Sequence, residues 1–114
     1  MLAPHIPNEQ DRLAALREFD VLDTPPEPEY DDLTRLAAMF SGTPIALVSL
    51  TDDRRQWFKS RHGVDVVEIP RDGSLCSHAV AGTDLFVVPD AAADERFKDN
   101  LIVVGEPHVR FYAG

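Results

Sequence analysis

The chain has 114 residues, which is enough for one ordinary domain and too few for a second core. Hydrophobic residues make up 44% and charged residues 27%, a balance typical of a folded globular protein and not of a disordered tail. With 11 Lys and Arg against 20 Asp and Glu, the formal net charge is -9, which repels phosphate backbones and argues against nucleic-acid binding.

The apolar runs are short. Ile45 to Leu50 and Leu101 to Val104 are far below the roughly 20 residues that cross a bilayer, and Met1 to Gln10 lacks the basic start and apolar core of a signal peptide. We therefore expect no membrane insertion and a cytoplasmic location. The single cysteine, Cys76, excludes an intrachain disulfide and agrees with a reducing compartment.

A first helix is predicted from about Asn8, which suits a side-chain cap because acidic residues follow it in the first turn. Its apolar stripe consists of Leu13, Leu16 and Phe19. The Asp-Thr-Pro-Pro stretch from Asp23 ends this helix, because each proline lacks a donor and restricts the residue before it.

A second helix follows and has the clearest pattern in the chain. Its apolar residues are spaced at i, i+3, i+4 and i+7, namely Leu33, Leu36, Ala37 and Phe40. Asp31 and Arg35 are predicted to form an exposed i,i+4 pair, and Gly42 suits the left-handed position at the C-terminal end.

The remaining residues predict short strands interrupted by short helices. Ile45 to Leu50 reads as a strand covered on both faces, and Gln56 to Arg61 as its partner in a hairpin. The later elements are a helix from Ser74 to Ala81, a strand from Leu85 to Val88, one helical turn from Asp94 to Asp99, an ambiguous segment from Leu101 to Val104, and a strand from Val109 to Tyr112. This order predicts an α+β fold with a largely antiparallel sheet.

Several blocks of the sequence, in their order, resemble the GAF domain. They are NEQDRL from Asn8, LDTP from Leu22, RQWFKS from Arg55, PRDGSLCSHA from Pro70, VPDA from Val88, Arg96-Phe97, and RFYAG from Arg110. The resemblance covers residues 7–114, after an N-terminal tail of residues 1–6, and is to the bacterial subgroup at the N-terminus of sensor histidine kinases and cyclic-di-GMP enzymes. It implies a central antiparallel sheet with the N-terminal helices on one face and loops with short helices on the other.

The resemblance also implies a function. Such domains sense a small molecule in bacterial signal transduction, perform no chemistry themselves, and bias an attached output domain, commonly as homodimers that meet through their helices. For the first helix, coverage of Leu13, Leu16 and Phe19 by the chain's own sheet is an equal alternative to a dimer contact. Two other functions remain open: a ligand-free dimerisation or interaction platform, and, ranked last, thiol-based redox chemistry at Cys76, which lacks a second cysteine to resolve it.

The expected pocket is bordered by the segments from Arg71 to His78 and from Asp90 to Phe97, which are long connections over one face of the sheet. The candidate ligand-binding residues are Arg71, Asp72, Cys76, His78, Asp90, Phe97 and Arg110. The competing interpretation is architectural: the aspartates hydrogen-bond their own loops, and Arg110 forms an internal ion pair instead of meeting an anionic ligand.

Cys76 and His78 suggest two further possibilities, a reactive thiol and a cofactor site. We expect an unreactive, buried packing residue at Cys76. The motifs support no bilin, haem or metal, since Ser77 separates Cys76 from His78 and the chain has no metal-ligand spacing. The residues of a cyclic-nucleotide signature, Phe97, Lys98 and Asn100, occur in the wrong order. The ligand therefore remains unknown.

The resemblance implies at least one further strand and a closing helix after the segment that matches Arg110 to Gly114. We therefore expect this sequence to be a fragment of a longer product or, less favoured, to receive the strand from another chain. The reason is that a gap in the middle of the sheet would leave unpaired backbone groups on Ile45 to Leu50 and on Val109 to Tyr112.

Overall fold

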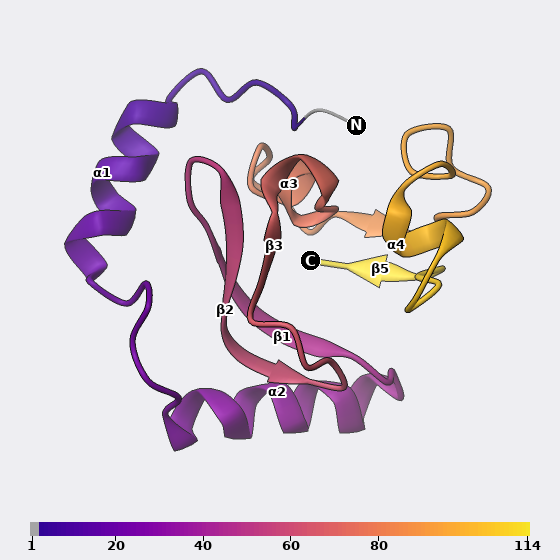
Figure 1. The fold of residues 1–114 in the computed structure, drawn as a ribbon, viewed down its shortest axis with the longest axis horizontal. Helices are drawn as coiled ribbons and strands as arrows, with labels where there is room; N and C mark the ends of the chain where they lie inside the picture. Colours follow the sequence, from indigo (N-terminus) through magenta and orange to yellow (C-terminus); the bar gives the residue numbers. More distant parts are fainter. Residues whose placement is uncertain (1–2) are drawn as a thin grey trace.

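A computed structural model describes residues 3–114. The elements of the first half are two helices, α1 (Glu9–Phe19) and α2 (Pro28–Ser41), and three strands, β1 (Ala46–Thr51), β2 (Arg55–His62) and β3 (Glu68–Pro70). The three strands form an antiparallel sheet in the order β1-β2-β3, with α2 packed across it (Figure 1). The predicted α+β class and the β1–β2 hairpin are confirmed.

The second half contains a single 3-10 turn, two short helices and a two-stranded antiparallel sheet. They are η1 (Arg71–Gly73), α3 (Cys76–Ala79), β4 (Val87–Val88), α4 (Leu101–Val104) and β5 (Tyr112–Ala113), with β4 paired to β5. In Figure 1 α4 and β5 lie on the right, beside the larger sheet, and α3 lies near the centre of the view. Within residues 3–114, no helix is long and apolar enough to span a bilayer.

The later elements are shorter than their sequence patterns predict. The helix expected from Ser74 to Ala81 is confined to α3. The single helical turn expected from Asp94 to Asp99 is present, because the Asp94 carbonyl accepts from the Phe97 and Lys98 N–H groups at 3.0 and 2.8 Å. The ambiguous segment becomes α4, because the Asn100 side chain caps it by accepting a hydrogen bond from the Ile102 N–H at 3.0 Å. The strands expected from Leu85 to Val88 and from Val109 to Tyr112 are shorter than predicted. In the structure β4 and β5 pair over only two residues each. The core of this half consists of Leu75, Val88, Ala91, Phe97 and Val103.

α2 packs on the sheet with a face that the apolar spacing did not indicate. Its buried residues are Thr34 and Ala38, and Thr34 Oγ1 lies 2.9 Å from Ser60 Oγ on β2. Ser60 Oγ also donates to Asp31 Oδ1 at 2.6 Å, so Asp31 faces the sheet and the predicted Asp31–Arg35 pair is wrong. Arg35 pairs instead with Asp32. As predicted, α2 ends at Gly42 with a left-handed backbone, φ 67.

The predicted apolar stripe of α1 is only partly buried. Leu13 and Leu16 are buried within the chain, whereas Phe19 is 74% exposed because it lies at the end of the helix. Asn8 occupies the position before the helix, but its side chain makes no capping hydrogen bond. The two buried leucines therefore favour the alternative in which α1 faces its own fold.

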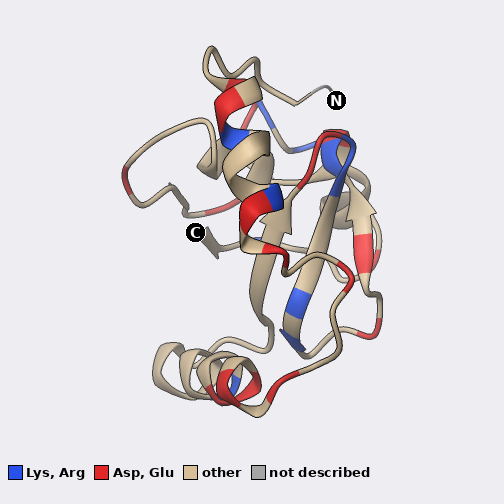
Figure 2. Cartoon of the chain, turned by 90° about the vertical axis from the view of Figure 1, so that its left-hand side faces the viewer, with Lys and Arg blue, Asp and Glu red and all other residues tan. Residues whose placement is uncertain are grey.

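Three ion pairs tie the N-terminal segment to the sheet and to η1. The acids are Glu9 on α1 and Asp23 and Glu27 in the α1–α2 connection, and they meet Arg71, Arg55 and Lys59 at 2.6, 2.6 and 2.5 Å. Figure 2 shows acidic bands on this segment and basic bands on the strands behind it. Charge pairing, added to the burial of Leu13 and Leu16, fixes where α1 lies.

β1 differs from its prediction in burial. Residues 46–50 are only half-buried, because among residues 3–114 β1 pairs with β2 alone and its other edge is free. β2, in the middle of the sheet, is more fully covered: the consecutive residues Trp57 and Phe58 are both buried, although they point to opposite faces. At the end of β2, Gly63 has φ +86, and a Cβ there would lie 2.0 Å from the Pro44 carbonyl oxygen, so this turn requires glycine.

Candidate functional site

Cys76, at the start of α3, lies where the two sheets meet. Tyr112 Oη on β5 donates a hydrogen bond to Cys76 Sγ at 2.9 Å, and Ser49 Oγ on β1 lies 3.9 Å from the same sulfur. Burial, more than the Cys76 contact, raises the pKa of Tyr112, so its hydroxyl stays protonated and remains a donor. Cys76 is half-buried and not fully buried as expected, because it lies at the margin between the sheets.

A row of buried polar side chains supports this junction from the side of the larger sheet. Gln56 is 1% exposed, and its Nε2 donates to Ser49 Oγ at 3.0 Å. Ser74 Oγ donates to the Gln56 amide oxygen from the start of the α3 segment. These bonds satisfy polar groups that would be costly to bury alone, and they fix Ser49 next to Cys76.

His78 and Phe97, from the two segments predicted to border a pocket, are in contact. The His78 ring packs edge-on against Phe97 with centroids 4.8 Å apart and stacks beside Phe86 at 6.1 Å. Burial, with a smaller contribution from the nearby Arg96, lowers the pKa of His78, so its imidazole is neutral at neutral pH. A neutral ring among aromatic groups can donate or accept one hydrogen bond without carrying charge.

Arg96 covers the outer side of this aromatic group. Its guanidinium carbon lies 5.1 Å from the Phe86 centroid and 5.0 Å from the Phe97 centroid. Arg96 also binds Asp94, with 2.7 Å between Nη2 and Oδ2, and these hydrogen bonds hold the pKa of Asp94 at about 2. The charge of Arg96 is thus paired and at the rim, while the group beneath it is aromatic and uncharged.

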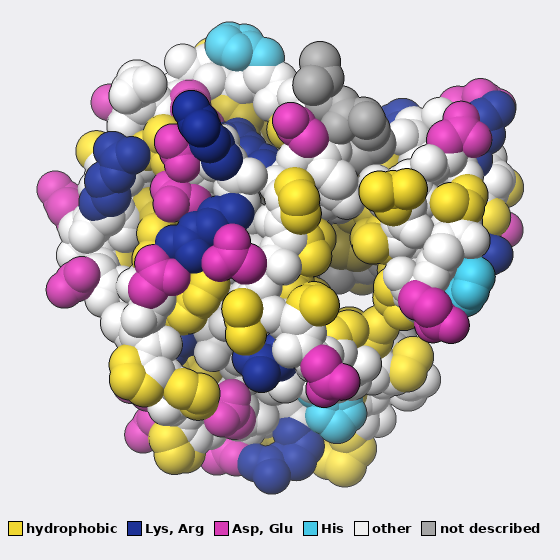
Figure 3. Space-filling model, in the orientation of Figure 1, with side chains coloured by type: hydrophobic (Ala, Val, Ile, Leu, Met, Phe, Trp, Pro, Cys, Tyr) yellow, Lys and Arg dark blue, Asp and Glu magenta, His cyan; other side chains and the backbone are white. Residues whose placement is uncertain are grey.

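The surface between the two sheets is hollowed. Figure 3 shows a depression right of centre, between the three-stranded sheet and the α4–β5 part, with hydrophobic side chains around its rim. The junction itself is made of Cys76, His78, Phe97, Tyr112 and Ser49, which we call the junction cluster. Small-molecule sites are usually concave and mostly apolar, with a few polar groups that orient the ligand.

Arg71 is placed elsewhere, in a pocket of about 440 Å³ between the N-terminal residues, α1 and η1, which Asp72 also lines. Arg71 is buried and its Nη1 bonds Glu9 Oε1 at 2.6 Å and the Asp52 carbonyl at 3.3 Å. Asp72 Oδ1 accepts from the Ala3 N–H at 2.8 Å. Both side chains are engaged in holding the N-terminal segment.

Asp90 and Arg110 also make internal contacts. Asp90 Oδ1 accepts from the Ala92 N–H at 3.0 Å, within its own loop, and Arg110 Nη1 donates to the Val103 carbonyl at 3.0 Å. The structure therefore brings Cys76, His78 and Phe97 together and places Arg71, Asp72, Asp90 and Arg110 in separate contacts. Across residues 3–114, no three His, Cys, Asp or Glu side chains are grouped as metal ligands would be.

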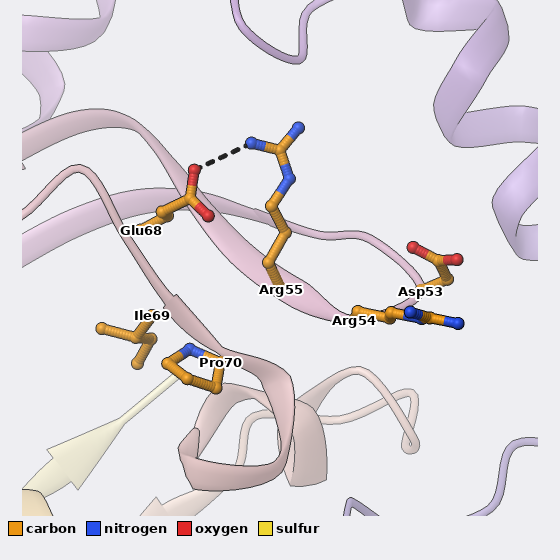
Figure 4. Close-up of a pocket in the computed structure, with 6 residues that line it drawn as sticks. All are labelled: Asp53, Arg54, Arg55, Glu68, Ile69 and Pro70. Atoms are coloured by element: carbon orange, nitrogen blue, oxygen red, sulfur yellow. Dashed lines mark hydrogen bonds and ion pairs between the residues drawn. The ribbon is translucent and has the colours of Figure 1, made fainter.

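A second pocket, of about 410 Å³, lies over the β2–β3 edge and was not anticipated from the sequence. Its lining residues are Asp53, Arg54, Arg55, Glu68, Ile69 and Pro70 (Figure 4). Arg55 Nη1 binds Glu68 Oε1 at 3.0 Å, and Arg55 also binds Asp23, so the central cation is already neutralised by two acids. The charge of Arg55 is therefore already satisfied within the chain.

Ser49, Gln56 and Tyr112 were not predicted as members or supports of the junction cluster. Each lies on a strand and shows no motif of its own, and its contact with the α3 segment joins residues 18 to 36 positions apart. The sequence offered one relevant pattern, the alternation of side chains along a strand. Alternation predicts on which face of the sheet a side chain lies, but not which loop covers that face.

Comparison with known proteins gives one informative match. The chain is 39% identical over 111 residues to a cyclic di-GMP phosphodiesterase of Pseudomonas aeruginosa. The alignment covers 97% of this chain and 19% of that protein, so the chain spans about a fifth of the length of this relative. No protein-family model matches the chain. The sequence is therefore similar to one part of a bacterial cyclic di-GMP signalling enzyme.

The Glu9 carboxylate, which is bound by Arg12 and Arg71, predicts a specific pH dependence of stability. Hydrogen bonds from Arg12 and Arg71 lower the pKa of Glu9 from its ordinary 4.5 to about 2. The stabilisation is therefore complete above pH 4.5 and is lost as the pH falls toward 2. In urea unfolding, we expect the stability difference between the wild type and Glu9→Gln to be large at pH 7 and smaller at pH 3. The 85% exposed Glu95 supplies a control, Glu95→Gln, and an equal Glu9→Gln difference at both pH values would contradict the assignment.

The half-buried sulfur of Cys76 predicts a slow native thiol. Because Tyr112 Oη contacts the sulfur and the residue is half-buried, we expect maleimide to label the folded protein at least about tenfold more slowly than the protein in concentrated guanidinium chloride. The measurement is a labelling time course followed by intact mass. Equal rates in the two conditions would show that the sulfur is freely accessible.

Proposed function

We propose that this chain is a regulatory, small-molecule-sensing domain of the GAF type, located in the cytoplasm within a bacterial cyclic di-GMP signalling protein. It performs no catalysis itself and passes its ligand state to an enzymatic output domain elsewhere in the parent protein. The order of the motif blocks supports the domain type. The similarity to one fifth of a cyclic di-GMP phosphodiesterase supports the signalling context.

The observation that carries the sensing role is the junction cluster. Ser49, Cys76 and Tyr112 come from β1, α3 and β5 and meet within 3.9 Å of one sulfur atom. The surface between the three-stranded sheet and the α4–β5 part is hollowed (Figure 3). A ligand that contacts this cluster touches both sheets at once. Its binding can therefore change the relative position of the two halves. A sensor transmits a signal through a change of this kind.

The cluster is suited to an uncharged or weakly polar ligand. His78 is neutral, Tyr112 stays protonated, and the neighbouring Arg96 is paired with Asp94. A strongly anionic ligand would meet no unpaired cation within this cluster, and the chain's charge of -9 would repel it. Cyclic di-GMP is thus proposed as the substrate of the parent's output domain and not as the ligand of this one.

Native mass spectrometry of the purified protein tests this proposal. We expect a bound small molecule that is released on denaturation, that is lost or at least tenfold depleted in His78→Ala, and that is retained in the control His62→Ala at an exposed histidine. An adduct of equal occupancy in all three proteins would contradict the site. A folded protein that carries no adduct would contradict sensing and favour the platform function.

A second candidate function, a ligand-free dimerisation or interaction platform, is favoured by one observation. The apolar stripe of α2 is exposed, with Phe40 at 83% and Leu33 at 57%. Large exposed apolar surfaces of this kind usually mark interaction sites. The two candidates differ in whether a ligand binds, and the stripe lies on a different element from the junction cluster, so each can be tested by itself.

A further inference from the structure

A pocket of about 440 Å³ lies between residues 3–6, α1 and η1, and we call it the N-terminal pocket. None of the residues of the junction cluster lines it. Ile6 and Leu13, each 5% exposed, contribute apolar surface to its wall, and Arg17 on α1 and Arg71 on η1 contribute guanidinium groups. Figure 1 shows the N-terminal residues running from α1 across the top of the view. Apolar side chains beside a few polar groups are typical of small-molecule sites.

Arg71 has one buried donor without an acceptor. Its Nη1 and Nη2 donate to the two carboxylate oxygens of Glu9 at 2.6 and 3.3 Å, and Nη1 also lies 3.3 Å from the Asp52 carbonyl oxygen. Its Nε is buried and has no hydrogen-bond partner among residues 3–114. Burying an N–H of a charged group without an acceptor is costly. The Nε atom therefore indicates a place for an acceptor that these residues do not supply.

Arg17 adds a positive charge that is not paired. Its side chain is exposed on α1 and makes no ion pair or hydrogen bond within the described part of the chain. Of the acids that line the pocket, Glu9 is bound by two arginines, Asp72 accepts from the Ala3 N–H, and Asp53 is exposed. The two arginines that bind Glu9, together with Arg17, balance these acids. The surroundings of the pocket are therefore neutral in a chain whose net charge is -9.

We propose that the N-terminal pocket is a second binding site of this chain and takes a small monocarboxylic acid. The carboxylate oxygens are the acceptors for Arg71 Nε and for the Arg17 guanidinium, because guanidinium–carboxylate hydrogen bonds are charge-assisted and complementary in geometry. The hydrocarbon chain of the acid packs against Ile6 and Leu13. A single negative charge suits a locally neutral pocket, whereas the net charge of -9 repels a more highly charged anion.

The position of the pocket gives the bound acid a structural effect. The acid contacts residues 3–6, α1 and η1 together, so its binding stabilises the N-terminal segment on the rest of the fold. η1 ends at Gly73 and α3 begins at Cys76, so the acid also holds the segment that leads into the junction cluster. The site does not depend on a ligand at the junction cluster, and the two sites are tested separately.

Titration of the ¹⁵N-labelled protein with sodium butyrate tests the site, with sodium chloride at equal ionic strength as the reference. The Nε–Hε resonance of Arg71, assigned through the bonds of its side chain, reports directly on the acceptor. We expect a saturable shift of this resonance and of the Glu9 and Gln10 amides, with a dissociation constant of roughly 1–10 mM because the ligand is small. The uncharged isostere butyramide should bind at least about tenfold more weakly. An unmoved Arg71 resonance, or butyramide that binds as tightly as butyrate, would overturn the proposal.

Two arginine variants form a matched pair for this titration. Arg17→Met and Arg61→Met each remove an exposed arginine, and Arg61 on β2 lines neither the N-terminal pocket nor the pocket at Arg55. We expect Arg17→Met to bind butyrate at least about tenfold more weakly and Arg61→Met to bind it like the wild type. Circular dichroism verifies that both variants are folded. Equal binding by Arg17→Met and the wild type would contradict the assigned site.

Two further results would assign the acid differently. Inorganic phosphate that shifts the Arg71 resonance as strongly as butyrate would show a general anion site without apolar contacts and overturn the carboxylate assignment. Butyrate shifts confined to residues 76–79 and Tyr112 would place the acid at the junction cluster and overturn the N-terminal site. Neither result replaces the native mass measurement on His78→Ala, which tests the sensing role by itself.

Discussion

Replacing Phe97 with alanine is expected to lower the free energy of unfolding by about 3–5 kcal/mol. Phe97 is 1% exposed and packs in the core with Val88 and Val103, so the substitution removes a large buried side chain and leaves a cavity. It also removes the ring against which His78 packs at 4.8 Å. The measurement is urea unfolding followed by circular dichroism.

The matched control is Phe111→Ala, because Phe111 is 54% exposed. We expect that variant to lose less than about 1 kcal/mol, since most of its ring is already in contact with water. Equal losses at the two positions would mean that the second half of the chain has no defined core around Phe97.

Replacing Lys59 with methionine is the substitution with the next largest expected effect, about 2–4 kcal/mol. The Lys59 side chain is 1% exposed, and its Nζ donates to Thr24 Oγ1 and to the Pro25 carbonyl, each at 2.7 Å. It also pairs with Glu27 at 2.5 Å. Methionine preserves most of the volume, so the loss reports the contacts that hold the α1–α2 connection on β2.

Lys98→Met removes a lysine that pairs with Glu95 but is 44% exposed, and it serves as the control. Surface pairs of that kind contribute roughly 0–1 kcal/mol. If Lys59→Met were as mild as Lys98→Met, the N-terminal segment would not depend on the Lys59 contacts for its position.

The first half of the fold was predictable from the sequence because local signals determine it. Proline and glycine mark the ends of α2, and the apolar run followed by Asp52-Asp53 predicts the β1–β2 hairpin. The orientation of α2 was not predictable. Apolar spacing shows that a helix has a stripe, but Thr34 contacts Ser60 on β2 instead, and this depends on residues 26 positions apart.

The second half was less predictable because its elements are short. α3, β4 and β5 contain four, two and two residues, too few for any periodicity to develop, and tertiary contacts determine their bounds. The site residues were only partly predictable for the same reason, because tertiary contacts bring them together. Cys76 and His78 were found by residue type and Phe97 by its loop, but the contact of Tyr112 with Cys76 spans 36 positions.

The central claim is that a small molecule binds at the junction cluster and links the two sheets. Amide chemical-shift mapping tests it most directly, on ¹⁵N-labelled protein freed of its co-purified molecule and then titrated with that molecule. We predict that the largest shifts fall on residues 76–79, Phe97 and Tyr112 and on Ser49 of β1. Shifts confined to residues 53–55 and 68–70, around the pocket at Arg55, would contradict the account.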